Sequence, residues 1–210
     1  MGSEVILWGV GTSRTMRVHW MLLELGVDYR FYPIGSRTGE TQNPEFLRLN
    51  PRHKIPVLQH GSLVLTESAA IVEYLSETFP NSQIYRPSNP ESLAALREWC
   101  YFIMSELDAA SLYVVRRHLG LKGIYGAAPV AVAAAKDYFS HNLEAMAPRI
   151  GIASPYLLGA KLSAADILLM TCLEWALSEQ VILPQSVLRY RERVASRSAY
   201  QAALARNFVR

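Results

Sequence analysis

The character of the chain changes abruptly between residues 80 and 91, and this change limits the folds available to it. Prolines and small polar residues gather there: Pro80, Pro87, Ser88, Asn89 and Pro90. Before this segment, short apolar runs alternate with helical periodicity, whereas after it we find helical patterns and no strand signal. The sequence therefore predicts two domains, residues 1–84 and 85–210, with residues 80–91 as the linker.

The first domain is expected to combine strands and helices. Strand signals occupy residues 5–8, 29–34, 57–59 and 63–65. One-sided apolar periodicity predicts helices over residues 18–25 and 68–79, and a short helix is expected at 44–49. The order is βαβ, short helix, ββα. This order predicts an α/β domain with a mixed sheet that contains one antiparallel hairpin.

The second domain is expected to be an all-α helical bundle. Helical patterns run from residue 93 to 107 and on toward 119, from 129 to 147, and from 164 to 177. The last of these has only Asp166 and Glu174 as charged residues, which predicts a helix at the buried centre of the bundle. Ser163 and Asp166 resemble a capping box at its start, and Leu162 and Ile167 occupy the positions of a hydrophobic staple.

Composition and charge exclude several classes of function. Half of the residues are hydrophobic and the net charge is +3 (21 basic minus 18 acidic), so the chain can bury a core and has no strong charge signature for nucleic acid. Two cysteines cannot build a disulfide framework or a four-ligand zinc site, and no histidine pair has metal-binding spacing. No uncharged run reaches the length of a membrane span. We expect a cytoplasmic protein without metal, membrane or nucleic-acid partners. We also expect a solvated helix face at the arginines Arg189, Arg191, Arg193 and Arg197.

A turn rich in hydroxyl groups separates the first strand from the first helix. Residues 9–11 begin like a dinucleotide-binding fingerprint, but Arg14 stands where the third glycine belongs. Thr12, Ser13 and Thr15 lie at a helix N-terminus, where free backbone N–H groups favour an anion. Each hydroxyl suits an ordinary helix cap, or a hydrogen bond donated to a bound thiolate. The turn has no cysteine, which excludes a dithiol redox motif.

Two later segments suit a peptide-like ligand. A cis bond between Ile55 and Pro56, directly before a strand, would expose the backbone of Ile55 for pairing with a ligand, although a plain loop proline has the same pattern. Glu67 and Ser68 begin the next helix. The Ser68 hydroxyl and the helix N-terminus suit a carboxylate, while Glu67 suits an ammonium group or complements the helix dipole.

Together and in this order, these segments resemble those of the cytosolic glutathione transferases, and the resemblance covers nearly the whole chain. It rests on Asn50-Pro51 with residues 55–58, on residues 67–71 with Tyr74-Leu75, and on residues 159–166. It implies a thioredoxin-like, glutathione-binding first domain, a helical second domain, a homodimer, and a detoxification enzyme that uses glutathione as co-substrate.

The resemblance also implies a set of glutathione-binding residues: His53, Lys54, Ile55, Pro56, Glu67 and Ser68. Pro56 would be a cis proline, and the backbone of Ile55 would pair with the cysteinyl unit. Glu67 and Ser68 would hold the γ-glutamyl end, and His53 would lie near the glycyl carboxylate. Further contacts would come from Lys54 or Arg14.

The thiolate donor is expected to be a hydroxyl of serine type, because residues 5–14 contain no tyrosine and no cysteine. Counting back from Arg17 as in delta and theta class enzymes gives Ser13, and counting as in phi class enzymes gives Thr12. We favour Ser13, with Thr12 as the alternative. A hydrogen bond to a charged group contributes about 1.5–3 kcal/mol and one pKa unit corresponds to about 1.4 kcal/mol, so such a donor lowers a thiol pKa by roughly one to two units.

The electrophile is expected to bind along the long helix after the linker. Four residues at helical spacing could line this acceptor pocket, or form a surface or dimer contact: Tyr101, Ser105, Asp108 and Leu112. The expected reaction is attack of the glutathione thiolate on a small hydrophobic electrophile. The same thiolate would serve peroxide reduction or cis–trans isomerisation, and a non-catalytic glutathione-binding or assembly protein is the alternative from another class.

Overall fold

The computed structural model describes residues 3–153 and 155–208. The chain forms two compact units, one that runs to Arg86 and resumes at Ala195, and one that comprises Pro87–Val194. The last helix therefore belongs to the first unit, whereas the sequence grouped it with the helical domain. Its side chains pair with the first helix: Arg197 forms a bidentate contact with Glu24 at 2.6 Å for both bonds, and Tyr200 packs edge-on against Trp20.

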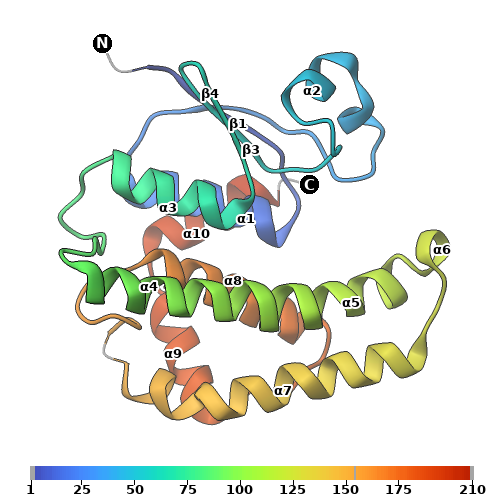
Figure 1. The fold of residues 1–210 in the computed structure, drawn as a ribbon, viewed down its shortest axis with the longest axis vertical. Coiled ribbons are helices and arrows are strands. Elements are labelled where there is room, and N and C mark those ends of the chain that lie inside the picture. Colours follow the sequence, from blue (N-terminus) through green and yellow to red (C-terminus); the bar gives the residue numbers. More distant parts are fainter. Residues whose placement is uncertain (1–2, 154, 209–210) are drawn as a thin grey trace. The chain divides into compact units, whose positions relative to one another are not determined.

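The first unit is a four-stranded mixed sheet with helices (Figure 1). Its elements are β1 (Val5–Trp8), α1 (Ser13–Leu25), β2 (Arg30–Tyr32), η1 (Glu40–Gln42), α2 (Pro44–Leu49), β3 (Val57–His60), β4 (Leu63–Thr66), α3 (Ser68–Thr78) and the returning α10 (Ser198–Asn207). The strand order is β2-β1-β3-β4, with β1 parallel to β2 and the other neighbours antiparallel. The predicted thioredoxin-like order βαβ, short helix, ββα is confirmed. The second strand is shorter than expected because Pro33, which has no N–H to donate, follows Tyr32.

Alternation along β1 places apolar side chains on both faces of the sheet. Trp8 packs in one cluster with Phe46 of α2 and Val57 of β3. Val5 and Leu7 point to the opposite face and are buried. Helices α1, α3 and α10 lie beside one another (Figure 1). The sheet is therefore covered on both faces, and the loops at the ends of β1 and β3 remain accessible for function.

The second unit is all helical, as predicted. Its elements are α4 (Pro90–Phe102), η2 (Ile103–Leu112), α5 (Tyr113–Val115), η3 (Arg116–Gly120), α6 (Lys122–Tyr125), α7 (Pro129–Ile152), α8 (Ala164–Ser178) and α9 (Gln185–Ala195). Helix α7 continues past Pro148, where the sequence led us to expect an end. None of the helices within the described residues is both long enough and apolar enough to cross a membrane.

Helix α8 is the buried centre of this unit and begins as the sequence predicts. Ser163 is its N-cap, and Ser163 and Asp166 form a reciprocal capping box. The carboxylate of Asp166 also accepts hydrogen bonds from the Leu157 N–H at 2.8 Å and the Tyr190 hydroxyl at 2.6 Å. Because Asp166 and Tyr190 are both fully buried, this carboxylate links three segments of the helical unit.

Candidate functional site

A cavity of about 50 Å³ lies in the first unit, where the loop before β3 meets the start of α3. It is lined by Arg14, Asn50, Arg52, Lys54, Ile55, Pro56, Thr66, Glu67 and Ser68. The structure thus brings together the two segments that the sequence singled out as peptide-binding, and Arg14 from the start of α1 joins them. His53 is exposed and is not among the lining residues.

The Ile55-Pro56 peptide bond is cis. Pro56 is buried directly before β3, and Ile55 is half-buried on the cavity wall. Gly9, at the end of β1, has φ +118°, and a Cβ atom there would lie 2.6 Å from Cβ of Ile55 and 2.9 Å from Cγ2 of Thr15. The absence of a side chain at Gly9 therefore lets the loop of Ile55 approach the start of α1.

Asn50 shapes the loop that carries the basic residues of the cavity. Its side chain is buried; Nδ2 donates to the Lys54 carbonyl at 2.8 Å and Oδ1 accepts from the Arg52 N–H at 3.1 Å. The backbone of His53 has φ +56° and donates to the Asn50 carbonyl at 3.1 Å. Asn50 therefore holds both Arg52 and Lys54 at the cavity.

The start of α3 supplies the other wall. Glu67 has φ +68°, an unusual backbone conformation for a residue other than glycine, and its carboxylate lies 2.8 Å from the Arg52 guanidinium. Ser68 is buried and accepts a hydrogen bond of 3.1 Å from Arg17, whose side chain is fully buried. Because the guanidinium is the donor, the Ser68 hydroxyl keeps its own proton for a ligand.

The charges around the cavity favour an anion that also carries one positive group. Three cationic residues line it (Arg14, Arg52 and Lys54) against the single carboxylate of Glu67, and buried Arg17 adds a charge behind Ser68. The Arg52–Glu67 ion pair is more than half exposed, and such pairs contribute little to stability. Both partners can therefore turn to opposite charges on a ligand at small cost.

The hydroxyl turn is built around a cap. Thr12 is the N-cap of α1, and its Oγ1 accepts from the Thr15 N–H at 3.0 Å while the Thr12 N–H donates to Thr15 Oγ1 at 3.0 Å. Ser13 is the first helical residue and is half-buried. Within the described residues its hydroxyl has no hydrogen-bond partner. The Ser13 proton is therefore uncommitted, and the Thr12 oxygen already serves the cap.

Sequence reasoning missed Arg17, Asn50, Arg52 and Thr66 as parts of this site. Arg52 and Thr66 meet only through the fold, where Nη2 of Arg52 donates to Oγ1 of Thr66 at 2.8 Å. Arg17 did carry a signal: it stands four residues before the buried Met21, so it lies on the apolar face of α1. A charged residue on a buried face needs a partner, and here Ser68 is one.

The four residues expected to line an acceptor pocket do not share one exposed face. Tyr101 and Ser105 are exposed, whereas Asp108 and Leu112 are buried. The reason is that η2 is a π-helix, whose i→i+5 hydrogen bonds place more residues in each turn than the α-helical spacing that we assumed. Only Tyr101 and Ser105 remain candidates for an accessible surface.

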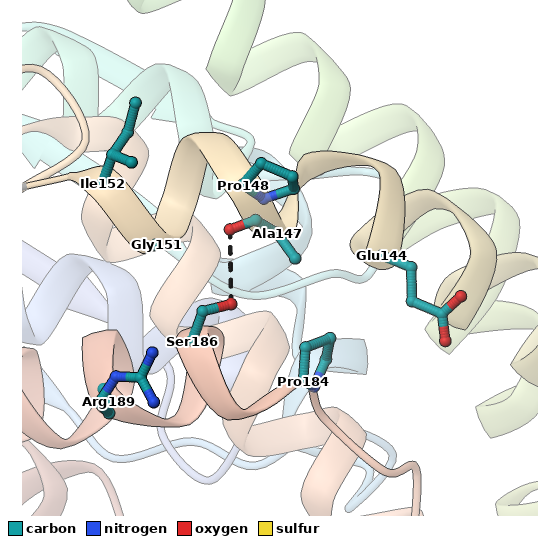
Figure 2. Close-up of a pocket in the computed structure, with 8 residues that line it drawn as sticks. All are labelled: Glu144, Ala147, Pro148, Gly151, Ile152, Pro184, Ser186 and Arg189. Atoms are coloured by element: carbon teal, nitrogen blue, oxygen red, sulfur yellow. Dashed lines mark hydrogen bonds between the residues drawn. The ribbon is translucent and has the colours of Figure 1, made fainter.

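A larger cavity, of about 500 Å³, lies in the helical unit between the end of α7 and the start of α9 (Figure 2). Its lining residues are Glu144, Ala147, Pro148, Gly151, Ile152, Pro184, Ser186 and Arg189. Figure 2 shows the Ser186 hydroxyl directed at the Ala147 carbonyl, a hydrogen bond of 3.5 Å. Glu144 and Arg189 are exposed and no polar side chain of this lining is buried, so the cavity lacks the fixed polar groups that orient a ligand.

The arginines of the last two helices do not form one solvated face. Arg191 makes a bidentate contact with Glu174 at 2.8 and 3.2 Å, and Arg193 donates to the carbonyls of Pro155 and Ala153. Arg197 is paired with Glu24, as described above. Among the described residues, no three His, Cys, Asp or Glu side chains gather closely enough to hold a metal ion.

Known proteins are similar to this chain in sequence and in fold. The family model for the glutathione S-transferase N-terminal domain matches residues 3–77. Glutathione S-transferase D7 of Drosophila melanogaster is 38% identical over 92 residues, which are 42% of this chain and 41% of the relative. The chain thus spans about two fifths of the length of that curated relative. Glutathione S-transferase TCHQD of Arabidopsis thaliana is 26% identical over 231 residues, covering 92% of this chain and 86% of the relative.

Solved structures extend the likeness to both units. The theta class glutathione S-transferase of Xanthomonas axonopodis pv. citri, solved with glutathione bound, has a TM-score of 0.80 at 26% identity and covers 97% of each chain. The glutathione transferase URE2P6 of Phanerochaete chrysosporium, in complex with oxidized glutathione, has a TM-score of 0.83 at 19% identity, covering 98% of this chain and 97% of that one. The latter likeness is one of fold.

The protein combines a thioredoxin-like domain with an all-helical domain. The thioredoxin-like domain has a charged cavity beside a cis proline. The matches to the N-terminal domain, to relatives and to solved structures all point to glutathione transferases. Residues 3–77 match the glutathione S-transferase N-terminal domain, and the chain is similar to glutathione transferases over most of its length.

Proposed function

We propose that this protein is a glutathione transferase whose tripeptide site is the cavity of the first unit. The observation that carries the proposal is the meeting of the cis Ile55-Pro56 loop with the start of α3 under several cationic side chains. Glutathione has two carboxylates and one ammonium group. A cavity with three cations, one carboxylate and a helix N-terminus complements that pattern of charge.

Each end of glutathione has chemically matched residues. The γ-glutamyl carboxylate fits the Ser68 hydroxyl, with the buried Arg17 charge behind it, and the ammonium group fits Glu67. The backbone of Ile55 would pair with the cysteinyl unit. Lys54 and Arg14 would take the glycyl carboxylate, with His53 on the exposed side of the same loop. The thiol of the central cysteinyl unit would then lie near the start of α1, because Ile55 and Thr15 both lie against Gly9.

The chemistry is activation of that thiol. A free thiol has a pKa of about 8.5, so only a few per cent is thiolate at pH 7. A hydroxyl proton donated to the sulfur, assisted by the positive end of α1, stabilises the thiolate. We propose Ser13 as this donor because its proton is uncommitted, with Thr12 as the alternative. The thiolate would then attack an electrophilic carbon of a small hydrophobic compound, forming a carbon–sulfur bond as the leaving group departs with its electron pair.

Glutathione binding and turnover test the proposal separately. Calorimetry with glutathione measures binding, and an aryl halide, an isothiocyanate and an organic hydroperoxide measure turnover with a carbon or an oxygen electrophile. Turnover of a carbon electrophile supports the transferase activity. Turnover of the hydroperoxide alone would indicate a peroxidase instead of a transferase. Binding without any turnover would favour a non-catalytic glutathione-binding protein, and the absence of binding would overturn the proposal.

We also propose that the protein is a homodimer. Strand β4 is an edge of the sheet, and it exposes Leu63 by 37% and Val64 by 41%. An exposed apolar edge strand is a surface that proteins usually cover. Sedimentation velocity at micromolar concentration should give a species of twice the chain mass, and Val64→Lys should shift it toward the monomer. A monomer for the unmodified chain would contradict this proposal.

A further inference from the structure

Asn207, the last residue of α10, is bound to the hydroxyl turn at the other end of the chain. It is only 1% exposed. Its backbone carbonyl accepts from the Gly11 N–H at 2.8 Å, its Nδ2 donates to the Thr12 carbonyl at 3.1 Å, and its Oδ1 accepts from Thr15 Oγ1 at 2.6 Å. These three contacts bracket Ser13, since they hold the two residues before it and the hydroxyl two residues after it.

The directions of the two hydrogen bonds of the Asn207 side chain follow from the chemistry of its partners. A carbonyl oxygen only accepts, so the Asn207 atom that faces the Thr12 carbonyl must be the amide nitrogen, and the atom that faces Thr15 Oγ1 is then the amide oxygen. Thr15 has one hydroxyl proton and two carbonyl oxygens within reach, Asn207 Oδ1 at 2.6 Å and the Thr12 carbonyl at 2.9 Å, and the shorter contact is to Asn207. It follows that Thr15 Oγ1 acts as an acceptor toward Thr12, both for the Thr12 N–H and for the Thr12 hydroxyl at 3.0 Å.

This arrangement commits the Thr12 proton and leaves the Ser13 proton available at the turn. Thr12 Oγ1 accepts from the Thr15 N–H and donates its own proton to Thr15 Oγ1. The Ser13 proton is uncommitted, and Asn207 holds the backbone before Ser13 and the Thr15 side chain after it. The Ser13 hydroxyl can therefore donate to an anion in front of the turn, and its position depends on Asn207.

We propose that Asn207 is a positioning residue for thiolate formation, holding the turn through Thr12 and Thr15 so that the Ser13 hydroxyl proton faces bound glutathione. This inference rests on the proposed function. Without the Asn207 side chain, the Thr12 carbonyl loses a donor and Thr15 Oγ1 loses its shorter acceptor, so the turn no longer holds the Ser13 hydroxyl at the sulfur. A thiolate that loses a hydrogen-bond donor is disfavoured, so the thiol pKa would rise.

The test measures the pKa of glutathione bound to the protein, from the ultraviolet absorbance of the thiolate against pH. In Asn207→Ala we expect this pKa to rise by about one unit, which lowers the thiolate fraction at pH 6.5 about tenfold, while the glutathione Kd changes less than about threefold. Thr15→Val should raise it similarly, because it removes the hydroxyl through which Asn207 acts. The double variant should be no worse than either single one, as expected for residues in one network.

Arg197→Gln is the matched control. Arg197 holds the other end of α10 to α1 through Glu24, which lies in the last turn of α1. It should lower the unfolding midpoint and leave the thiol pKa unchanged. If Asn207→Ala only destabilises the fold in the same way, Asn207 is structural and the inference is wrong. If Asn207→Ala does not fold, an unchanged thiol pKa in Thr15→Val overturns the inference instead. If the unmodified protein does not bind glutathione, the proposed function and this inference both fail.

Discussion

Arg17 donates a hydrogen bond of 3.1 Å to the hydroxyl of Ser68, and both side chains are buried. The two residues are 51 positions apart, within the first two turns of α1 and at the start of α3. This contact carries a buried positive charge to the cavity wall that is formed by the N-terminus of α3. The charge and the helix N-terminus together favour an anion at that wall.

Removing this charge should weaken glutathione binding. Arg17→Met keeps most of the buried volume and leaves Ser68 in place, and we expect the binding free energy to fall by about 1.5–3 kcal/mol, the contribution of a hydrogen bond to a charged group. Calorimetry measures the affinity, and thermal unfolding checks that the fold persists. Arg48→Met, on the last turn of α2 and outside the cavity lining, is the control and should bind normally. An unchanged affinity in Arg17→Met would show that the Arg17 charge does not act on the ligand.

The residues at the start of α3 should contribute separately. Glu67→Ala and Ser68→Ala should each weaken glutathione binding by about 1.5–3 kcal/mol, because each removes one charge-assisted hydrogen bond. The analogue that lacks the γ-glutamyl unit, cysteinylglycine, distinguishes the cause. Its affinity should be nearly the same for the two variants and the unmodified protein. Normal glutathione affinity in both variants would show that the γ-glutamyl end does not bind in this part of the cavity.

Three substitutions in the turn test which hydroxyl donates a hydrogen bond to the thiolate. Ser13→Ala should lower the conjugation rate about 10- to 100-fold at pH 6.5, with a smaller loss at pH 9, where the solvent already deprotonates the thiol. Thr12→Ser retains the cap and the hydroxyl and should be nearly silent. Thr12→Val removes both, and we expect it to cost about 1 kcal/mol of stability, with a smaller loss of rate than Ser13→Ala.

The pH profiles decide between the alternatives. A larger, pH-dependent loss in Thr12→Val than in Ser13→Ala would identify Thr12 as the donor. If neither substitution alters the profile, the thiolate is held by backbone N–H groups and no side chain of the turn takes part.

The folded protein should lose stability in mild acid because His19 is buried in its neutral form. It is fully buried, and because the Gly9 carbonyl at 3.2 Å only accepts, Nε2 carries the proton and Nδ1 accepts from the Tyr29 hydroxyl at 2.8 Å. Burial lowers the pKa of His19 from 6.5 to about 4. Between these values the unfolded chain binds more protons than the folded one, so stability falls as pH falls from 6.5 toward 4, by about 2 kcal/mol at pH 5.

Urea unfolding at pH 7.5 and pH 5 measures this loss. His19→Gln can keep a donor toward Gly9 but does not titrate, so the difference between the two pH values should shrink by about 2 kcal/mol relative to the unmodified chain. His141, which is exposed on α7, provides the control substitution His141→Gln, with no expected change. Equal pH dependence in His19→Gln and the unmodified chain would contradict the neutral, buried state of His19.

Asp166 should be the most sensitive residue of the helical unit. Asp166→Ala leaves the Leu157 N–H, the buried Ser163 N–H and the buried Tyr190 hydroxyl without their acceptor, and we expect a loss of about 4 kcal/mol or more of unfolding free energy. Circular dichroism during urea unfolding measures it. Asp137→Ala, at an exposed position of α7, should cost less than about 1 kcal/mol. Similar losses in the two variants would show that the Asp166 network contributes little.

The sequence by itself determined the features that depend on a few neighbouring residues. Apolar periods of two and about 3.6 residues predict the strand and helix order of the first unit, because each period places one face of an element in the core. The capping box at the start of α8 was predicted because Ser163 and Asp166 are only three residues apart. The hydroxyls at the start of α1 and the Glu67-Ser68 pair were found for the same reason: their chemistry belongs to a helix N-terminus.

Only the tertiary structure decided which distant residues meet. Asn207 reaches Thr15 across 192 positions, and no local pattern in α10 distinguishes it from a polar residue at a helix end. The π-helical register of η2 separates Tyr101 from Leu112, because the hydrogen-bond period of a helix responds to packing as well as to its sequence. Contacts of this kind depend on the relative positions of whole elements, and those are set by how buried side chains pack rather than by the spacing of residues along the chain.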